Sequence, residues 1–380
     1  MRVTWRFPLG KCIDGSPVSR GHIAYIGSHS GLLAAVSTAN GHSYWTIDLG
    51  ARIEGSPALS LDGSLVIIGT HDGHVYAIDA KNGAKKWAAR TNGIVKCTPL
   101  VVGDRVFFGA HDHVARAVDV ATGEATWMRV LDGAVVAAPR AIGREKVVFA
   151  TLGGSVHVVD AATGDLVWSR GGFKPIFAAV ALVWPRGEVQ EILGDSSTQE
   201  PGKPNVIHEL DLPDIQDPRG HVSHESHDLS FSDPRGLLVP AVDGTLCLLS
   251  LSGDTIWRER IGSTVYSSPV VCGGVAWLGA DDGVLRGYDA ASGRLVVEDR
   301  LGDGHITAAP TCVMLEDGGS IIVIASTDAV VHVVHVKDGK VERKESVRVD
   351  SKESFSSPVV MRDMILIGTR GDVLVGIQLE

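Results

Sequence analysis

A tryptophan recurs along this chain at nearly constant intervals, and this repeat constrains the fold more than any other feature. The position is held in turn by Trp5, Trp45, Trp87, Trp127, Trp168 and Trp257, and then by Val297 and Arg343. The intervals between them are 40, 42, 40, 41, 89, 40 and 46 residues. Self-similarity at a fixed period of this length is the sequence signature of a repeat architecture.

Two further markers keep the same period. A glycine lies four residues before each tryptophan position from the second onward, as Gly83 does before Trp87. A proline also recurs, at Pro17, Pro57, Pro99, Pro139, Pro269, Pro310 and Pro358, with Val180 where one more is expected. The proline positions therefore define eight units.

Each unit contains short apolar or alternating runs separated by turn residues. In the second unit, Leu65–Gly69 and His74–Asp79 flank the turn His71-Asp72-Gly73, a pattern typical of paired strands. About four such strands per unit predict an all-β, eight-bladed β-propeller of four-stranded antiparallel blades. The last unit lacks an outermost strand and residues 2–8 supply a spare one, so we predict that the N-terminal strand completes the last blade. This pairing would close the ring and protect its edges.

The 89-residue interval marks an insertion in the fifth unit. We predict a single propeller domain over residues 1–380, interrupted at 185–235 by an acidic segment with 11 Asp and Glu against 4 Lys and Arg. Such a composition predicts disorder, in a loop on the face opposite the His-Asp-Gly turns. Its closely spaced His221, His224 and His227 are consistent with a metal site, but we expect them to be solvated and predict no metal.

The composition indicates in which compartment the protein acts and which classes of partner it does not bind. The five cysteines are odd in number and scattered, which favours a reducing compartment over a disulfide framework. No apolar segment at the start resembles a secretory signal, and no apolar run is long enough to span a bilayer. The net charge of −10 includes no basic stripe for nucleic acid. We therefore expect a cytoplasmic protein with neither a membrane nor a nucleic-acid partner.

Comparison of equivalent positions in the eight units points to one end of the central channel. Three residues before the proline position stand Asp14, Glu54, Lys96, Val136, Phe177, Tyr266, Thr307 and Phe355. The turn after the second strand carries His29, His71, His111, Leu152, Val242, Asp281, Thr327 and Arg370. Both rings follow the same strand direction, so we expect both at one mouth.

This mouth is predicted to be charged on the first three units and aromatic opposite, as a ligand pocket often is. The candidate ligand-binding residues are Asp14, Glu54, Lys96, His29, His71, His111, Phe177, Tyr266 and Phe355. The alternative is that the charges face water and the histidines hydrogen-bond their own turns. We predict no catalytic residue, although Cys97, beside Lys96, is a candidate for a lowered thiol pKa.

The strings AIDAKNGAKKW, AVDVATGEATW and VVDAATGDLVW, which end at Trp87, Trp127 and Trp168, resemble the tryptophan-docking repeat of quinoprotein-type propellers. This resemblance implies a structural docking role for Trp5, Trp45, Trp87, Trp127, Trp168 and Trp257. It also offers an alternative function, a PQQ-dependent oxidoreductase with pyrroloquinoline quinone (PQQ) in the channel. Dehydrogenases of that family carry an adjacent pair of cysteines that this chain does not have, so we predict no cofactor.

The strings KCIDGSP, YIGSHS, FATLGG and IASTDA are similar to the C-terminal propeller of the β-alanine-activating enzyme family, also called acyl-CoA synthetase family member four. Proteins of this family join an AMP-forming adenylation domain, a phosphopantetheine carrier and a propeller. The resemblance implies a non-catalytic scaffold or ligand-sensing module whose partners are adenylation and carrier domains, either as a fragment or as a free-standing relative. A second alternative is a protein-interaction platform that uses the acidic insertion.

Overall fold

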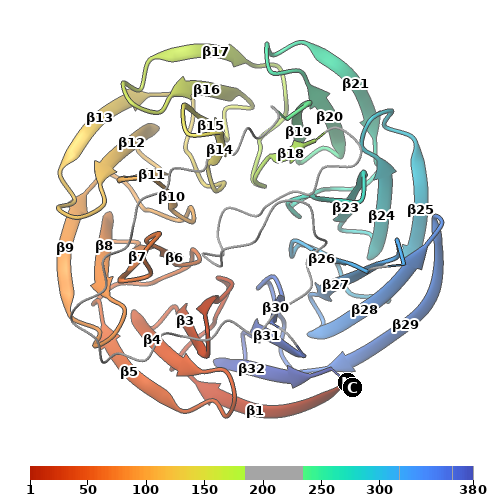
Figure 1. The fold of residues 1–380 in the computed structure, drawn as a ribbon, viewed down its shortest axis with the longest axis horizontal. Helices are drawn as coiled ribbons and strands as arrows, with labels where there is room; N and C mark the ends of the chain where they lie inside the picture. Colours follow the sequence, from red (N-terminus) through yellow and green to blue (C-terminus); the bar gives the residue numbers. More distant parts are fainter. Residues whose placement is uncertain (185–233, 316, 362, 380) are drawn as a thin grey trace, which may run out of the picture.

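The computed structural model describes residues 1–184, 234–315, 317–361 and 363–379. Their strands form eight four-stranded antiparallel sheets arranged as blades around a central axis, with one strand of each blade innermost and one outermost (Figure 1). This confirms the predicted eight-bladed, all-β propeller. In the described part of the chain, no helix is long and apolar enough to cross a membrane.

The strands of blades 1 to 4 follow one another from the channel outward. Blade 1 contains β2 (Val18–Arg20), β3 (Ile23–Gly27), β4 (Leu32–Ser37) and β5 (Ser43–Asp48). Blade 2 contains β6 (Ala58–Leu59), β7 (Leu65–Gly69), β8 (His74–Asp79) and β9 (Lys85–Arg90). Blade 3 contains β10 (Leu100–Val102), β11 (Arg105–Gly109), β12 (Val114–Asp119) and β13 (Ala125–Val130). Blade 4 contains β14 (Arg140–Ile142), β15 (Lys146–Ala150), β16 (Val156–Asp160) and β17 (Leu166–Arg170).

Blades 5 to 8 repeat the order, except that the last blade takes its outer strand from the start of the chain. Blade 5 contains β18 (Ala181–Val183), β19 (Gly236–Pro240), β20 (Thr245–Leu249) and β21 (Thr255–Arg260). Blade 6 contains β22 (Val270–Cys272), β23 (Val275–Gly279), β24 (Val284–Asp289) and β25 (Leu295–Arg300). Blade 7 contains β26 (Thr311–Met314), β27 (Ser320–Ser326), β28 (Val330–Lys337) and β29 (Lys340–Arg348). Blade 8 contains β30 (Val359–Met361), β31 (Met364–Gly368), β32 (Val373–Gln378) and β1 (Arg2–Pro8).

The pairing of β1 with β32 closes the ring. The two strands are antiparallel, with a register that runs from Arg2 opposite Gln378 to Pro8 opposite Val373. The chain ends accordingly lie side by side in Figure 1. This confirms the predicted closure, in which the first and last strands of the sequence share one blade.

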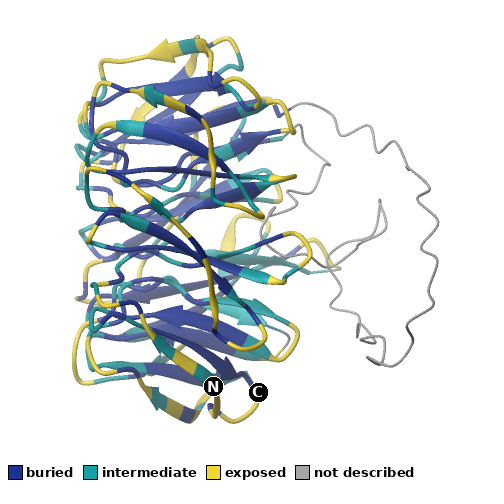
Figure 2. Ribbon diagram, turned by 90° about the vertical axis from the view of Figure 1, so that its left-hand side faces the viewer, coloured by how far each residue is buried: buried dark blue, intermediate teal, exposed yellow. Residues whose placement is uncertain are grey.

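The core lies between blades rather than within any one of them. The middle strands are buried on both sides, as in β3 and β4, whereas the outer strands expose most of their residues, as in β9. Figure 2 shows the same distribution edge-on, with buried strands through the disc and exposed loops at both of its faces. Strands packed between two neighbours must be apolar on both faces, which explains their near-continuous β-branched runs.

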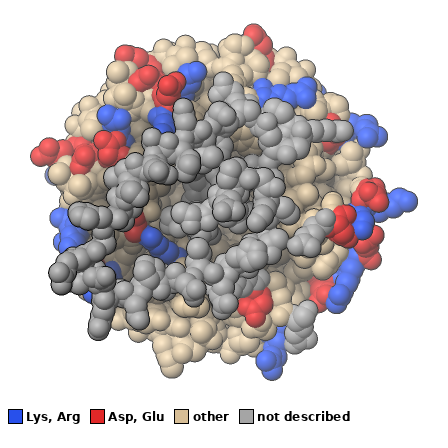
Figure 3. Space-filling model, viewed as in Figure 1, with Lys and Arg blue, Asp and Glu red and all other residues tan. Residues whose placement is uncertain are grey.

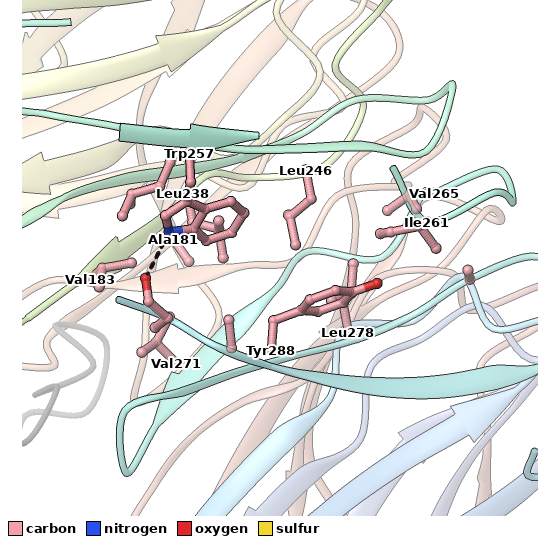
Figure 4. Close-up of a cluster of buried hydrophobic side chains, with 14 residues drawn as sticks. Ala181, Val183, Leu238, Leu246, Trp257, Ile261, Val265, Val271, Leu278 and Tyr288 are labelled. Atoms are coloured by element: carbon pink, nitrogen blue, oxygen red, sulfur yellow. Dashed lines mark hydrogen bonds between the residues drawn. The ribbon is translucent and has the colours of Figure 1, made fainter. Parts of the chain in front are cut away.

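The recurring tryptophan and glycine form one contact between neighbouring blades. In each of six cases the indole N–H donates a hydrogen bond of 2.7–3.1 Å to a carbonyl of the next blade: Trp5 to Thr38, Trp45 to Ala80, Trp87 to Val120, Trp127 to Ala161, Trp168 to Leu251 and Trp257 to Ala290. Figure 4 shows the last of these bonds as a dashed line.

The glycine is the surface on which the indole of the preceding blade lies. At Gly123, for example, φ is +73° and an added Cβ would lie 2.6 Å from the ring of Trp87. Any larger residue would be strained by the backbone conformation and would displace the indole. The glycine before one tryptophan therefore serves the tryptophan of the preceding unit, which is why the two markers share a period.

Blades 6 and 7 meet in a different way, because Val297 holds the tryptophan position of blade 6. A fully buried Trp277 on β23 packs into the core between these two blades, together with Val297. Cys272 on β22 and Cys312 on β26 form a disulfide that joins the innermost strands of the two blades, with a Cα–Cα distance of 6.3 Å. The expectation that the cysteines form no disulfide was wrong, because it considered cysteine number and not the contact between residues one repeat apart.

Candidate ligand site at the channel mouth

The same two short segments of every blade form one mouth of the channel. The leading segment precedes the first strand, and the middle turn joins the second strand to the third. In all eight blades a backbone N–H of the middle turn donates to a carbonyl of the leading segment, as His71 does to Arg52 at 2.9 Å and Thr327 does to His305 at 2.8 Å. The backbone of the mouth therefore repeats regularly, and its side chains decide how each part differs.

On blades 8 and 1, the side chains at this mouth are tied together around Asp14. Arg370 makes a two-pronged ion pair with this carboxylate, each nitrogen lying 3.1 Å from an oxygen, and His29 Nε2 lies 3.2 Å away. Burial works to raise the pKa of Asp14, but hydrogen bonds from His29 and Arg370 outweigh it and lower the pKa to about 2. The Asp14 side chain is only 11% exposed, so this is a largely enclosed charge cluster.

Blades 2 and 3 contribute a second cluster, around Glu54. Its carboxylate oxygens lie 3.0 Å from Lys96 Nζ, 3.1 Å from Arg52 and 2.9 Å from His71 Nε2. Burial opposes ionisation of Glu54, but these cations outweigh it and lower its pKa. Burial is also the main reason that the pKa of His71 is lowered.

His111 lies next in this series. Burial and the nearby Lys96 lower its pKa, and its Nε2 has no hydrogen-bond partner among the described residues. Arg52 lies 3.3 Å from His29 and so links the two clusters. We call this set the charged arc: Asp14, His29, Arg52, Glu54, His71, Lys96, His111 and Arg370.

The other side of the mouth is hollow. A pocket of about 380 Å³ is lined by residues from the leading segments and middle turns of blades 6, 7 and 8: Tyr266, Asp281, His305, Thr307, Thr327, Glu353 and Phe355. We call it the aromatic pocket. Its His305 pairs with Asp281, whose backbone carbonyl is the main cause of a raised pKa for that histidine.

Aromatic rings stand at both ends of the aromatic pocket. The ring of Phe177 meets that of Tyr266 edge to face at 5.5 Å, and both side chains are about two-fifths exposed. At the opposite end, the guanidinium of Arg370 lies 3.9 Å from the ring centroid of Phe355. The charged arc and the aromatic pocket therefore meet at Arg370.

The structure gives the nine candidate residues different surroundings. Asp14, Glu54, Lys96, His29, His71 and His111 lie in the charged arc, and all but His111 have an ion-pair partner there. Tyr266 and Phe355 line the aromatic pocket, and Phe177 contacts it through Tyr266. The pocket thus lies on blades 6, 7 and 8. It does not lie between the charged residues and the aromatic residues, where the sequence predicted it.

Three residues of this mouth were missed: Arg52, His305 and Glu353. All three occupy one position of the repeat, two residues before the position that Glu54, Thr307 and Phe355 hold in their own blades. The carbonyl of this position accepts the hydrogen bond from the middle turn in every blade. A comparison of this third position across the units would have identified them.

Cys97 does not have the lowered pKa for which it was a candidate. The thiol is buried between blades, hydrogen-bonded to the backbone of Gly109, and burial raises its pKa to about 11. Cys97 follows directly after Lys96, and the equivalent position in every blade holds only a small residue, such as Gly15 or Gly55. An added Cβ on Gly55 would lie 2.5 Å from the carbonyl oxygen of Lys96, so this position faces the neighbouring blade and not the channel.

The mouth does not match a calcium–quinone centre. Asp14 and Glu54 are each paired with arginine or lysine, and the disulfide joins cysteines 40 residues apart instead of adjacent ones. Within the described ranges, no three His, Cys, Asp or Glu side chains are grouped so that they could hold a metal ion. The residues at this mouth therefore do not fit bound PQQ.

The predicted acidic insertion, residues 185–235, lies outside the described residues apart from 234 and 235, as do His221, His224 and His227. Its described neighbours, Val183 and Arg235, are hydrogen-bonded to each other at the end of the blade opposite the mouth. On the face seen in Figure 3, acidic and basic side chains are intermixed around the edge of the disc.

Two family models match the sequence, each over slightly less than half of it. Residues 9–195 match the β-propeller of the beta-alanine-activating enzyme, and residues 203–378 match the outer membrane protein assembly factor BamB. The chain is a PQQ-like repeat propeller related to that of the beta-alanine-activating enzyme. The matches agree with both resemblances in the repeat strings.

Curated relatives match only a short stretch. The beta-alanine-activating enzyme of Danio rerio is 40% identical over 70 residues, which are 17% of this chain and 6% of that protein. The Mus musculus enzyme is 36% identical over 75 residues, 18% of this chain and 7% of that protein. The matched stretch is thus a small part of these much longer proteins.

Solved structures share the fold over the whole chain. BamB from Moraxella catarrhalis is 18% identical with a TM-score of 0.70, and the alignment covers 100% of this chain and 99% of that one. The computationally designed Ika8 protein is 15% identical with a TM-score of 0.73 and full coverage of both chains. At these identities the likeness concerns the fold alone.

Proposed function

We propose that this PQQ-like repeat propeller is a non-catalytic binding module that docks the adenylating or carrier part of an AMP-forming, amino-acid-activating enzyme. The observation that carries the proposal is the aromatic pocket, where Tyr266 and Phe355 border a hollow of about 380 Å³. A partly exposed aromatic group beside a few polar groups is the usual anchor point of a binding surface.

The polar groups of the aromatic pocket favour binding over catalysis. The hydroxyl of Thr327 accepts the backbone N–H of His305 at 3.0 Å, which fixes the shape of the loop. His305 is itself oriented by Asp281. These contacts build a rigid wall and leave the ring of Tyr266, which is 41% exposed, available to a partner.

The choice of partner rests on the similarity of this chain to the propeller of the beta-alanine-activating enzyme. The matching propeller model is that of an enzyme named for activating β-alanine, and an accessory propeller would act by holding the domains of such an enzyme in place. We also propose a cytoplasmic location. The Cys272–Cys312 disulfide argues against it, because such bonds persist mainly in oxidising compartments, so recovery of the protein from cells with this bond formed would contradict the proposed location.

The test is to capture partners with tagged protein in cells of its own source and to assay the captured material for ATP–pyrophosphate exchange. We expect exchange that depends on an amino acid, with β-alanine tried first, to be enriched by the unaltered protein. The double variant Tyr266→Ala and Phe355→Ala should lose most of this enrichment.

Tyr44→Ala is the matched control, because Tyr44 is an exposed tyrosine on the outer strand β5 and 58% exposed. Enrichment equal for the unaltered protein and the double variant would contradict docking at the aromatic pocket. Absence of amino-acid-dependent exchange from every capture would contradict the choice of partner.

A further inference from the structure

Resting on the proposed docking function, we infer that the aromatic pocket receives a positively charged side chain, an arginine or lysine of the partner. The inference concerns the chemistry of the bound group, which neither the fold nor the relatives specify. It follows from the charge and shape of the lining and from a contact of the same kind within this chain.

The charges that line the aromatic pocket are mainly negative. Asp281 and Glu353 contribute two carboxylates, whose side chains are 41% and 60% exposed. None of the seven lining residues is a lysine or an arginine. His305, whose pKa is raised beside Asp281, offsets one of these two charges, and the carboxylate of Glu353 is the more exposed of the two. A cation is therefore the charge type that this lining would attract.

The aromatic rings favour the same conclusion. A cation over a ring face is attracted by the negative charge of the π system, and the attraction grows when the cation is partly desolvated. At the edge of the pocket, Arg370 already lies over Phe355 in this way. Tyr266 lines the opposite wall, and no cation of the described residues lies over its ring.

A hydroxyl group in the wall has an unused hydrogen-bonding capacity. Thr307 Oγ1 is buried and has no hydrogen-bond partner among the described residues. Asp281 and Thr327 line the pocket with it. An ammonium or guanidinium group has several N–H donors and no acceptor, so it suits a lining of carboxylates and hydroxyls. Because the hollow is small, one side chain and not a folded domain would occupy it.

The neighbouring charges do not cancel this preference. Arg370 approaches Glu353 at 3.4 Å, but its guanidinium is held mainly by two contacts with Asp14. The cations of the charged arc, Lys96 and Arg52, are similarly paired with Glu54. Asp281 and Glu353 thus have one cationic neighbour each, His305 and Arg370, and their carboxylates stay 41% and 60% exposed to an incoming group.

The experiment measures binding of four blocked tripeptides, acetyl-Gly-X-Gly-amide with X as arginine, lysine, norleucine or glutamate, by ligand-observed NMR with the full chain. We expect the arginine and lysine peptides to bind at least tenfold more tightly than the norleucine and glutamate peptides. The variants Tyr266→Ala and Glu353→Gln should each weaken their binding at least fivefold, whereas Tyr44→Ala should not change it.

Free butylamine and guanidinium distinguish the two sources of such a cation. Equal binding of these small cations and the peptides would indicate a free amine as the ligand, and would overturn the assignment to a partner side chain. Equal binding of the norleucine and lysine peptides would overturn the charge preference. If the four peptides bind equally while capture of exchange activity still depends on the aromatic pocket, the docking function stands and this inference fails. If the cationic peptides bind preferentially while capture does not depend on the aromatic pocket, the docking function fails and the charge preference stands.

Discussion

The charged arc and the aromatic pocket occupy one mouth and share one backbone, yet one side is closed and the other open. In both regions the middle turn is hydrogen-bonded to the leading segment in the same way. On blades 8 and 1 to 3, opposite charges at these positions pair with one another, as in Asp14 with Arg370. On blades 6 to 8, aromatic and hydroxyl groups leave a hollow instead. Charged residues around a channel are thus no sign of a ligand site when they can satisfy one another.

The two regions also differ in how their blades are joined. Blades 8 and 1 to 5 each place an outer-strand tryptophan against the next blade, whereas blade 6 has Val297 and a disulfide to blade 7. The aromatic pocket is lined by both of the blades that the disulfide joins, together with blade 8. Substitutions in each region test whether the two regions differ in these ways.

The largest expected effect is the loss of an interblade tryptophan. Trp127 is 8% exposed and packs in a core with Phe107 and Phe149, so Trp127→Ala should lower the free energy of unfolding by about 3–5 kcal/mol. Val297→Ala, at the same repeat position in blade 6, should cost only about 1–2 kcal/mol because it removes about two methylene equivalents. Urea denaturation of both variants measures the difference, and equal losses would show that the two interfaces are not distinct.

A somewhat smaller effect is expected from the disulfide. Replacement of Cys272 and Cys312 by serine should lower the free energy of unfolding by about 2–4 kcal/mol, because the crosslink restricts the unfolded chain. A reducing agent should lower the free energy of unfolding of the unaltered protein by a similar amount and leave that of the double variant unchanged. Alkylation of five thiols in the native protein, detected by mass spectrometry, would contradict the crosslink.

Because of the charged arc, the free energy of unfolding should fall at acid pH. The pKa of Asp14 is depressed from 3.8 to about 2 in the folded protein, so its contribution is fully present above about pH 4 and is lost as the pH falls toward 2. The loss amounts to about 2 kcal/mol. Stability measured from pH 5 to pH 2 should fall less steeply in Asp14→Asn. An identical slope in both proteins would mean that Asp14 is not held by Arg370 and His29.

The repeat made most of the fold predictable, including the number of blades and the pairing of β1 with β32. It did so because Trp87, Gly123 and their equivalents act at a fixed distance along the chain, where one interblade contact recurs. The disulfide was missed because it depends on the approach of β22 and β26, which cysteine counting does not address.

The candidate site was predictable only in part. The two sets of repeat positions were expected at one mouth because both follow the same strand direction, and there Asp14 lies beside His29 and Glu54 beside His71. That these groups pair closely, and that the hollow lies near Tyr266 and His305, depends on side-chain reach. Side-chain reach has no period, so the repeat could not reveal it.

Amide hydrogen exchange with and without the captured adenylating partner shows whether partners dock at the aromatic pocket or at the charged arc. We predict slower exchange in residues 264–268, 303–309 and 351–357, which carry the aromatic pocket, and no change in residues 12–16, 52–56 and 94–98 of the charged arc. Protection confined to the charged arc, or to the connections on the opposite face, would contradict docking at the aromatic pocket.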